Sequence, residues 1–187
     1  ELGQAIHSKG VMILTGYLGH SYAQQFPLAI SASIAIEQSY GYIDGDSASL
    51  AELCCLISAL TRIPIMQSFA VTGSINQYGE VQAVGGVNEK IEGYFRLCQA
   101  RGLNGEHAAI IPAANKRNLM LKQEVIDAVA NGLFAIYAVA SVDETLELLT
   151  GQLAGEANEE GSYPENSINF KAISRLKEIS DMSADDE

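Results

Sequence analysis

Apolar and polar positions alternate in blocks along the chain, and the blocks predict helices separated by short strands. The run from Gly10 to Gly16 predicts a short buried strand that is closed by glycine. From His20 to Ser39, Ala, Leu and Ile recur at helical spacing, and we expect a helix in which Pro27 is a kink or a first-turn residue. The apolar run that begins at Leu50 predicts a buried helix that ends before Pro64.

The middle of the chain predicts a β-hairpin followed by a helix. Met66 to Thr72 is strand-like, and Glu80 to Val84 alternates as a half-exposed strand that pairs with it through the loop Gly73 to Gly79. Gly85 and Gly86 end this strand. The segment from Asn88 to Arg101 then predicts a helix with one apolar face, made of Ile91, Tyr94, Phe95 and Cys98.

Two further strands are predicted from Ala108 to Ile111 and from Phe134 to Val139. Between them, Asn118 to Ala130 predicts an amphipathic helix. Because strands and helices alternate along the whole of this region, the sequence predicts an α/β fold, or a mixed α+β fold.

The texture of the sequence changes near residue 150. Ser141 is placed to cap a helix that runs through Leu149, and Glu144 at its third position completes a capping box. From Gly151 onward Gly, Glu, Asn and Ser predominate, as in a linker, and a modest helical stripe follows before the acidic end: Ile168, Phe170, Ile173, Leu176 and Ile179. We therefore expect a domain over residues 1–150, and an acidic linker and C-terminal helix over residues 151–187 that docks on this domain or on a neighbour.

Composition narrows the class of protein. At 187 residues and 48% hydrophobic residues, the chain is long enough for one well-packed domain. A net charge of −12 argues against nucleic-acid binding, which requires clustered Lys and Arg. Because the three cysteines are odd in number and two of them are adjacent, a secreted disulfide framework is not expected, and we expect a cytoplasmic location. No apolar run is long enough to span a bilayer, and the first residue, Glu1, predicts that the chain is part of a longer one.

The candidate nucleophile lies in the turn Asp44-Gly45-Asp46-Ser47-Ala48-Ser49. Ser47 is placed on a glycine-containing turn at the start of the predicted buried helix. The start of a helix presents free backbone N–H groups and the positive end of the helix dipole. A nucleophile and an oxyanion-binding site can therefore share this one turn.

A serine hydroxyl requires a base. The histidines His7, His20 and His107 do not lie in motif-like settings, so a Ser–His–Asp triad is the weaker hypothesis. Lys90 lies at the start of a predicted helix, just after the diglycine. Burial and the positive end of the helix would both lower its pKa from the ordinary value of about 10.4. Lys90 is therefore the better candidate base, in a Ser–Lys dyad; as an ordinary helix residue it would simply be solvated.

Three blocks of sequence together resemble the proteolytic domain of the Lon protease family. They are Asp44 to Ser49, then Ala70-Val71-Thr72-Gly73-Ser74-Ile75-Asn76, then the stretch from Gly85 to Gly93, and they occur in the family's order and spacing. Ile110 to Leu119 is similar to the family's next segment. The resemblance covers roughly residues 10–150, and Asp-Ser-Ala-Ser at the nucleophile is similar to the B-type branch. It implies the Lon proteolytic domain fold.

The resemblance implies Ser47 as the nucleophile and Lys90 as the general base of a serine endopeptidase. Thr72 occupies the position of the family's threonine near the lysine, where its hydroxyl would hold the amine in line; otherwise it is an ordinary β-branched residue at a strand end. Asp44 would pair with Lys90 in an inactive geometry or cap the helix turn, and Asp46 is an equally good cap.

The family also implies partners. Lon-type proteases degrade unfolded or damaged proteins and join this domain to an AAA+ ATPase in a ring of six subunits. The ATP-binding pattern G-x-x-x-x-G-K-S/T does not occur here, so we expect ATP and Mg²⁺ to bind an ATPase portion outside these residues, and no cofactor or metal within them. The alternative is a Lon-fold module whose dyad is not assembled and which serves oligomerisation or binding. In it, Asp44 and Asp46 would hold Lys90 charged, so that Lys90 could not act as a base.

Overall fold

A three-stranded parallel sheet and a separate two-stranded hairpin form the β-structure of the protein. The computed structural model describes residues 5–185 of the chain. Its elements in chain order are α1 (Ala5–Tyr22), α2 (Ser49–Thr61), β1 (Phe69–Val71), β2 (Ser74–Ile75), β3 (Val81–Gln82), α3 (Val87–Arg101), β4 (Ala108–Pro112), the 3₁₀ helix η1 (Ala113–Asn118), α4 (Gln123–Ala130), β5 (Ala135–Val139), α5 (Val142–Thr150) and α6 (Ile168–Asp185). The expected α/β class is confirmed.

The parallel sheet has the order β1–β4–β5, so that β4 lies in the middle. Ala70 pairs with Ala109 across the first ladder, and Ala109 with Ile136 across the second. The hairpin is antiparallel, with Ile75 opposite Val81. The predicted hairpin is thus confirmed at its second strand, but its first strand is β2, inside the segment predicted as a loop, while β1 pairs with β4 instead.

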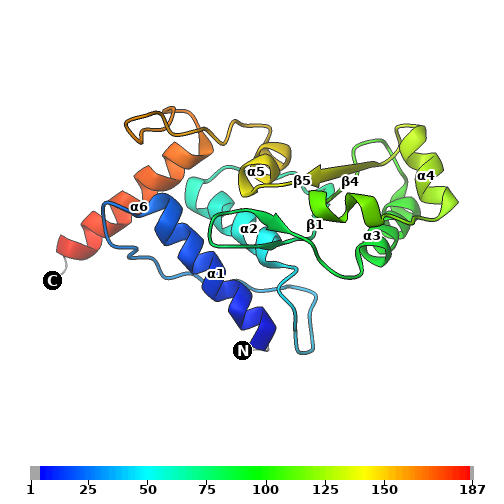
Figure 1. The fold of residues 1–187 in the computed structure, drawn as a ribbon, viewed down its shortest axis with the longest axis horizontal. Helices are drawn as coiled ribbons and strands as arrows, with labels where there is room; N and C mark the ends of the chain where they lie inside the picture. The colour runs from blue at the N-terminus through cyan, green and yellow to red at the C-terminus, as the bar shows by residue number, and fades with distance from the viewer. Residues whose placement is uncertain (1–4, 186–187) are drawn as a thin grey trace.

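Two apolar cores lie on opposite faces of the sheet, because side chains alternate along a strand. Ile110 of β4 packs into a core with α1, α2, α5 and α6, whereas its neighbours Ala109 and Ile111 pack into a second core with α3 and α4. Figure 1 shows this division, with α3 and α4 at one end of the molecule and α1, α2 and α6 at the other. The sheet therefore joins two helical layers.

The strand predicted from Gly10 to Gly16 is wrong, since this segment lies within α1. The buried residues of α1 recur every three or four positions: Gly10, Leu14, Tyr17, Leu18 and Tyr22. This is the period of one helix face. The seven-residue window was too short to reveal it, and packing of this face outweighs the strand propensity of the short apolar run.

The helix predicted from His20 to Ser39 is also wrong. The first three residues of the predicted helix, from His20 to Tyr22, are the end of α1. Residues 23–48 form extended and turn structure without a helix. The apolar side chains at even positions between Leu28 and Ile36 line one cavity, which is the period-two pattern of an extended chain. Pro27 lies in the extended segment beyond the end of α1 at Tyr22, so it neither kinks this helix nor stands in a first turn.

The remaining helix predictions are largely confirmed. α2, α3 and α5 lie where they were expected, but α4 begins at Gln123 rather than at Asn118, because η1 occupies the preceding residues. The Ser141 hydroxyl accepts from the Glu144 N–H at 3.1 Å, and the Glu144 carboxylate accepts from the N–H of Ala140, one residue before the cap. The predicted capping box is therefore present, except that the Glu144 carboxylate binds the N–H of Ala140 instead of that of Ser141.

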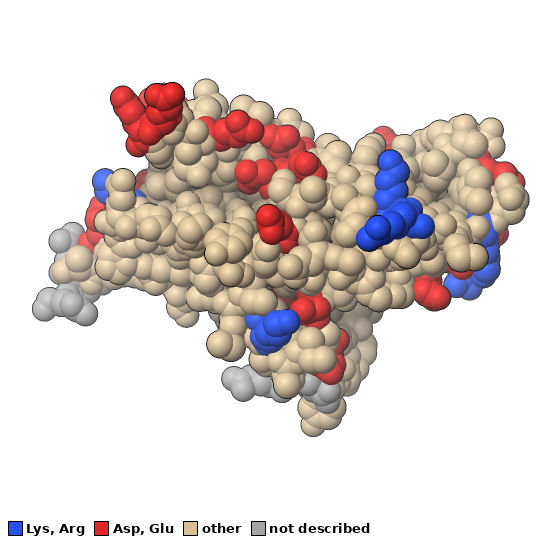
Figure 2. All heavy atoms as spheres, in the orientation of Figure 1, with Lys and Arg blue, Asp and Glu red and all other residues tan. Residues whose placement is uncertain are grey.

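The predicted C-terminal helix is confirmed as α6, and it docks on the domain itself. Ile168, Ala172 and Leu176 belong to the same core as α1 and α2. Acidic side chains gather along the edge where the linker after α5 runs (Figure 2). The division of the chain after residue 150 stays a prediction. Within residues 5–185, no helix combines the length and the apolar character that crossing a membrane requires.

The docking of α6 predicts a loss of stability when its contact with the core is truncated. Leu176 is 2% exposed, so Leu176→Ala should lower the free energy of unfolding by about 2–5 kcal/mol, through lost apolar burial and the cavity left behind. Thermal denaturation should show a midpoint roughly 5–15 °C lower. Lys177→Ala, on the exposed neighbour, is the matched control and should change little. Equal midpoints for the two variants would contradict the docking.

Candidate active site

The turn that carries Ser47 is clamped to the end of β1 by two backbone hydrogen bonds. The Gly73 N–H donates to the Ser47 carbonyl at 2.9 Å, and the Leu50 N–H donates to the Gly73 carbonyl at 3.2 Å. Ala48 is the N-cap of α2, so Ser47 directly precedes the helix, as the sequence predicts. The clamp fixes the position of the serine relative to the strand.

Glycine is required at position 73 because the two backbones approach closely there. A Cβ atom at Gly73 would lie 2.9 Å from Leu50 Cδ2 and 3.1 Å from Val81 Cγ1. Real Cβ atoms almost never make such contacts, and both neighbours are core side chains. The glycine of the second sequence block is therefore explained by packing against the first turn of α2.

Lys90 reaches this turn from the first turn of α3. Gly86 precedes the helix in the left-handed conformation, with φ of 66°, and its carbonyl accepts from the Lys90 N–H at 3.0 Å. The Lys90 Nζ donates to the Ser47 Oγ at 2.9 Å and to the Thr72 Oγ1 at 3.2 Å. The Lys90 amine is thus within hydrogen-bond reach of both hydroxyls, those of Ser47 and Thr72, as the sequence predicts.

Partial burial lowers the pKa of the Lys90 amine, because loss of water disfavours its charged form. Among the ion pairs of residues 5–185, none includes Lys90. A carboxylate at this place would raise the pKa again. The surroundings therefore shift the amine toward its neutral form, while the side chain as a whole remains exposed to solvent.

Thr72 joins the lysine to the backbone of the serine. Its hydroxyl accepts from Lys90 and donates to the Ser47 carbonyl at 3.4 Å, a long hydrogen bond. With its proton directed to the carbonyl, the hydroxyl presents a lone pair to the amine. Thr72 thus has the geometry of a group that orients Lys90.

Asp44 and Asp46 do not pair with Lys90. The Asp44 Oδ1 accepts from the Ile6 N–H at 3.2 Å, so it caps the start of α1 rather than that of α2. The Asp46 Oδ2 lies 3.7 Å from the Lys9 Nζ, and its backbone carbonyl accepts from the Ser49 N–H. Both carboxylates thus contact the first turns of α1, and neither forms an ion pair with Lys90.

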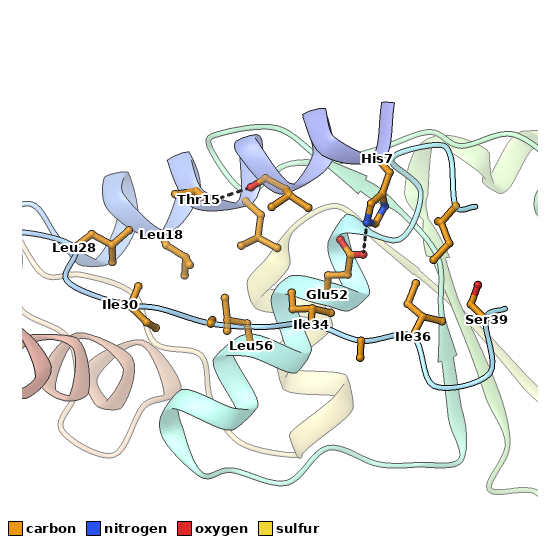
Figure 3. Close-up of a pocket in the computed structure, with 15 residues that line it drawn as sticks. His7, Thr15, Leu18, Leu28, Ile30, Ile34, Ile36, Ser39, Glu52 and Leu56 are labelled. Carbon is orange, nitrogen blue, oxygen red and sulfur yellow. Dashed lines mark hydrogen bonds and ion pairs between the residues drawn. The ribbon is translucent and has the colours of Figure 1, made fainter. Parts of the chain in front are cut away.

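Within residues 5–185, no hydrogen bond or ion pair joins a histidine to Ser47. The His7 Nε2 lies 3.5 Å from the Glu52 Oε1, at one end of a cavity of about 630 Å³ between α1, α2 and the extended segment (Figure 3). The His20 ring packs edge-on against Tyr78, and the Nδ1 of His107 is buried without a partner near the start of β4. This arrangement does not support a Ser–His–Asp triad at Ser47.

A smaller pocket of about 270 Å³ opens beside Ser47, Thr72 and Lys90. Apart from these three, its walls are apolar or aromatic: Ala48, Ala51, Ala70, Val71, Ile91, Tyr94, Ala109, Ile110 and Ile111. It lies at the carboxyl end of β1, the edge at which open α/β sheets usually bind ligands. Although other cavities are larger, this pocket is the one that adjoins the serine and the lysine.

A metal-dependent reaction finds no donor set in residues 5–185. No group of three or more His, Cys, Asp or Glu side chains lies close enough to hold an ion there. Of the three cysteines, Cys54 and Cys98 are buried, whereas Cys55 is exposed.

Comparison with known proteins agrees with this site. Residues 32–151 match the sequence model of the Lon protease (S16) C-terminal proteolytic domain. The chain belongs to this family. The matched region holds all three residues that meet at the pocket, and the B-type resemblance accords with the archaeal Lon proteases among its relatives.

Several relatives are similar over much of the chain. A Lon protease homolog of Escherichia coli K12 is 52% identical over 80% of this chain and 25% of its own length. One of Haemophilus influenzae is 47% identical over 94% of this chain and 28% of its own length. The archaeal Lon protease of Methanocaldococcus jannaschii is 41% identical over 62% of this chain and 15% of its own. The chain therefore spans about a quarter, or less, of the length of these Lon relatives.

Sequence reasoning did not assign Tyr94 to the site. The residue was placed on the apolar face of its helix, yet it also lines the pocket beside the serine. The signal was its spacing of four from Lys90, which puts both side chains on one side of α3. The small pocket residues Ala51, Ala70 and Ala109 carry no such signal, because alanine is common in helices and cores.

The environment of Lys90 predicts an unusual titration. Because desolvation lowers its pKa, Lys90 should titrate below about 10.4 in the folded protein and near that value in the urea-unfolded protein. NMR of ¹³C-methylated lysines, assigned with Lys90→Arg, measures both. The lowering should persist in Ser47→Ala, since its cause is burial rather than the bond to Ser47. Equal folded and unfolded values would contradict this reading.

Proposed function

We propose that this chain is a serine endopeptidase domain with a Ser47–Lys90 dyad. The single observation that carries the proposal is the 2.9 Å contact between the Lys90 Nζ and the Ser47 Oγ, beside a pocket and without a carboxylate on the amine. Membership of the Lon proteolytic family supports the same reaction class.

In the proposed reaction, neutral Lys90 accepts the proton of Ser47 as the serine oxygen attacks the carbonyl carbon of a peptide bond. The resulting ammonium then gives this proton to the leaving amine, and the bond to nitrogen breaks. A water molecule, deprotonated by the same amine, next attacks the ester carbon and releases Ser47. Each proton that Lys90 takes is returned, so one residue acts as base and as acid.

The start of α2 supports stabilisation of the negative oxygen that develops on the attacked carbonyl. The N–H groups of Ser49 and Leu50 donate to carbonyls of the chain, whereas in its described part the N–H groups of Ser47 and Ala48 have no backbone acceptor. These two donors lie at the positive end of the helix dipole. We propose that they bind the oxyanion, since donors fixed in advance are the most effective.

We further propose that the domain acts within a longer assembly. The relatives are roughly four times as long as the stretch that they share with this chain, which supports an AAA+ ATPase portion that binds ATP and Mg²⁺. On the family's pattern, the ATPase would deliver unfolded proteins to Ser47 in a ring of six identical subunits. The alternative of an inactive module rested on Asp44 and Asp46 holding Lys90 charged, and their contacts with Ile6 and Lys9 do not favour it.

The proposal predicts that loss of either member of the dyad abolishes cleavage. Ser47→Ala removes the nucleophile and Lys90→Ala removes the base, so each should reduce hydrolysis of unfolded casein by at least about 1,000-fold. The assay uses the full-length polypeptide with ATP, and circular dichroism checks that each variant is folded. Ser33→Ala and Lys177→Ala, at exposed positions, should leave cleavage unchanged. Retained cleavage in Ser47→Ala or Lys90→Ala would rule out the dyad.

Thr72 is predicted to affect the rate rather than substrate binding. Thr72→Val keeps the shape of the side chain but removes the hydroxyl that orients Lys90, which should lower kcat by roughly 10–100-fold with little change in KM. Thr72→Ser restores the hydroxyl and should recover most of the rate. Steady-state kinetics on a fluorogenic peptide separates the two constants. A raised KM with an unchanged kcat would show that Thr72 serves binding instead.

A further inference from the structure

Two side chains of α3 form hydrogen bonds at opposite ends of β1. Lys90 and Tyr94 are one helical turn apart, about 6 Å along the axis. Lys90 contacts Thr72, just after β1, whereas the Tyr94 hydroxyl donates to the Ser68 carbonyl, just before β1, at 2.6 Å. Four residues of extended chain span roughly 13 Å. The two long side chains therefore diverge, and the space between them belongs to the pocket beside Ser47.

The Tyr94 ring is held firmly at the far end of this space. Its hydroxyl is fixed by Ser68, and its ring packs against Phe134, with 6.1 Å between the ring centroids. Between the ring and the dyad, the walls come from the small side chains of Ala51, Ala70 and Ala109. The dyad and the fixed Tyr94 ring therefore line the same pocket, one turn of α3 apart.

The size of the pocket suits one side chain. A cavity of about 150 Å³ holds a benzene ring, so the 270 Å³ beside Ser47 suffices for one apolar side chain of ordinary length. Lys90 is the charged residue of its wall, and it belongs to the dyad. A charged substrate side chain would lose its hydration against the remaining apolar walls, which disfavours it.

We propose that Tyr94 determines substrate specificity, by limiting the length of the side chain on the residue whose carbonyl Ser47 attacks. The Cα of this residue is bonded directly to the attacked carbon. Its side chain therefore lies nearest to the pocket beside Ser47. The favoured class is an apolar side chain of the size of Leu, and a longer bicyclic side chain such as Trp meets the Tyr94 ring. This inference rests on the proposed endopeptidase function.

The test compares fluorogenic peptides that differ only at this residue, cleaved by the full-length polypeptide. The unaltered protein should favour Leu over Trp by roughly tenfold or more in kcat/KM. Tyr94→Ala opens the far end of the pocket and should reduce this ratio by about tenfold, mainly through improved cleavage after Trp. Tyr94→Phe keeps the ring and is the matched control, so its ratio should stay close to that of the unaltered protein.

A second variant tests the same pocket from the opposite wall. Ala51→Leu, on α2, keeps a good helix former and fills the pocket. It should reduce cleavage after Leu by roughly tenfold or more while cleavage after Ala stays within about threefold. This variant tests whether the pocket holds that side chain. If Tyr94→Ala does not fold, Tyr94→Leu, which also removes the ring, takes its place, and an unchanged Leu-to-Trp ratio in it would overturn the role of Tyr94.

The outcomes separate the two proposals. A folded Tyr94→Ala protein with an unchanged Leu-to-Trp ratio and with cleavage that still depends on Ser47 would overturn the role of Tyr94 alone. Cleavage that persists in Ser47→Ala would instead overturn the endopeptidase proposal, and the specificity inference with it. A ratio that falls in Tyr94→Ala but not in Tyr94→Phe supports the assignment.

Discussion

The backbone clamp between Gly73 and the first turn of α2 is the constraint on which the site depends. It joins the end of a strand to the start of a helix through two main-chain hydrogen bonds, so the distance between Ser47 and Thr72 is set by backbone rather than by side-chain rotamers. Lys90 then needs only to span from α3 to a target that is already fixed. Reacting groups held in this way lose little freedom when the reaction begins, which is where much of the benefit of positioning arises.

The second requirement is a neutral amine in a strongly acidic protein. A net charge of −12 would ordinarily place carboxylates near most lysines, and an adjacent carboxylate stabilises the ammonium form. The structure directs the nearest acidic groups of the nucleophile turn, Asp44 and Asp46, to the first turns of α1. Lys90 keeps two hydroxyl contacts and partial burial, and the burial lowers its pKa. The helix cap and the lysine environment are thus two consequences of one arrangement.

Sequence reasoning located the site because its residues lie in short blocks next to strongly patterned elements. Ser47, Thr72 and Lys90 each stand at the end of a strand or the start of a helix, and such boundaries carry glycine and capping signals. The predictions of secondary structure before Ser47 were wrong for a physical reason. Gly10 to Gly16 is too short to distinguish a strand from about two turns of helix. Between Leu28 and Ile36, alanine at intervening positions imitates helical spacing. Tyr94 was missed because pocket walls depend on tertiary contacts, which periodicity along one helix does not report.

The position of α2 links the far C-terminus to the chemistry. α2 packs against α1, α5 and α6, and the Tyr22 hydroxyl of α1 donates to Asn169 of α6 at 2.8 Å, which ties two of these helices together. Asn169 in turn donates to the Gly155 carbonyl of the linker, so the acidic segment is held to the same core. A helix buried on several sides cannot shift without disturbing its neighbours, because packed cores resist small displacements. The predicted tail is therefore part of what holds α2 in place, and the proposed oxyanion donors just before this helix share that rigidity.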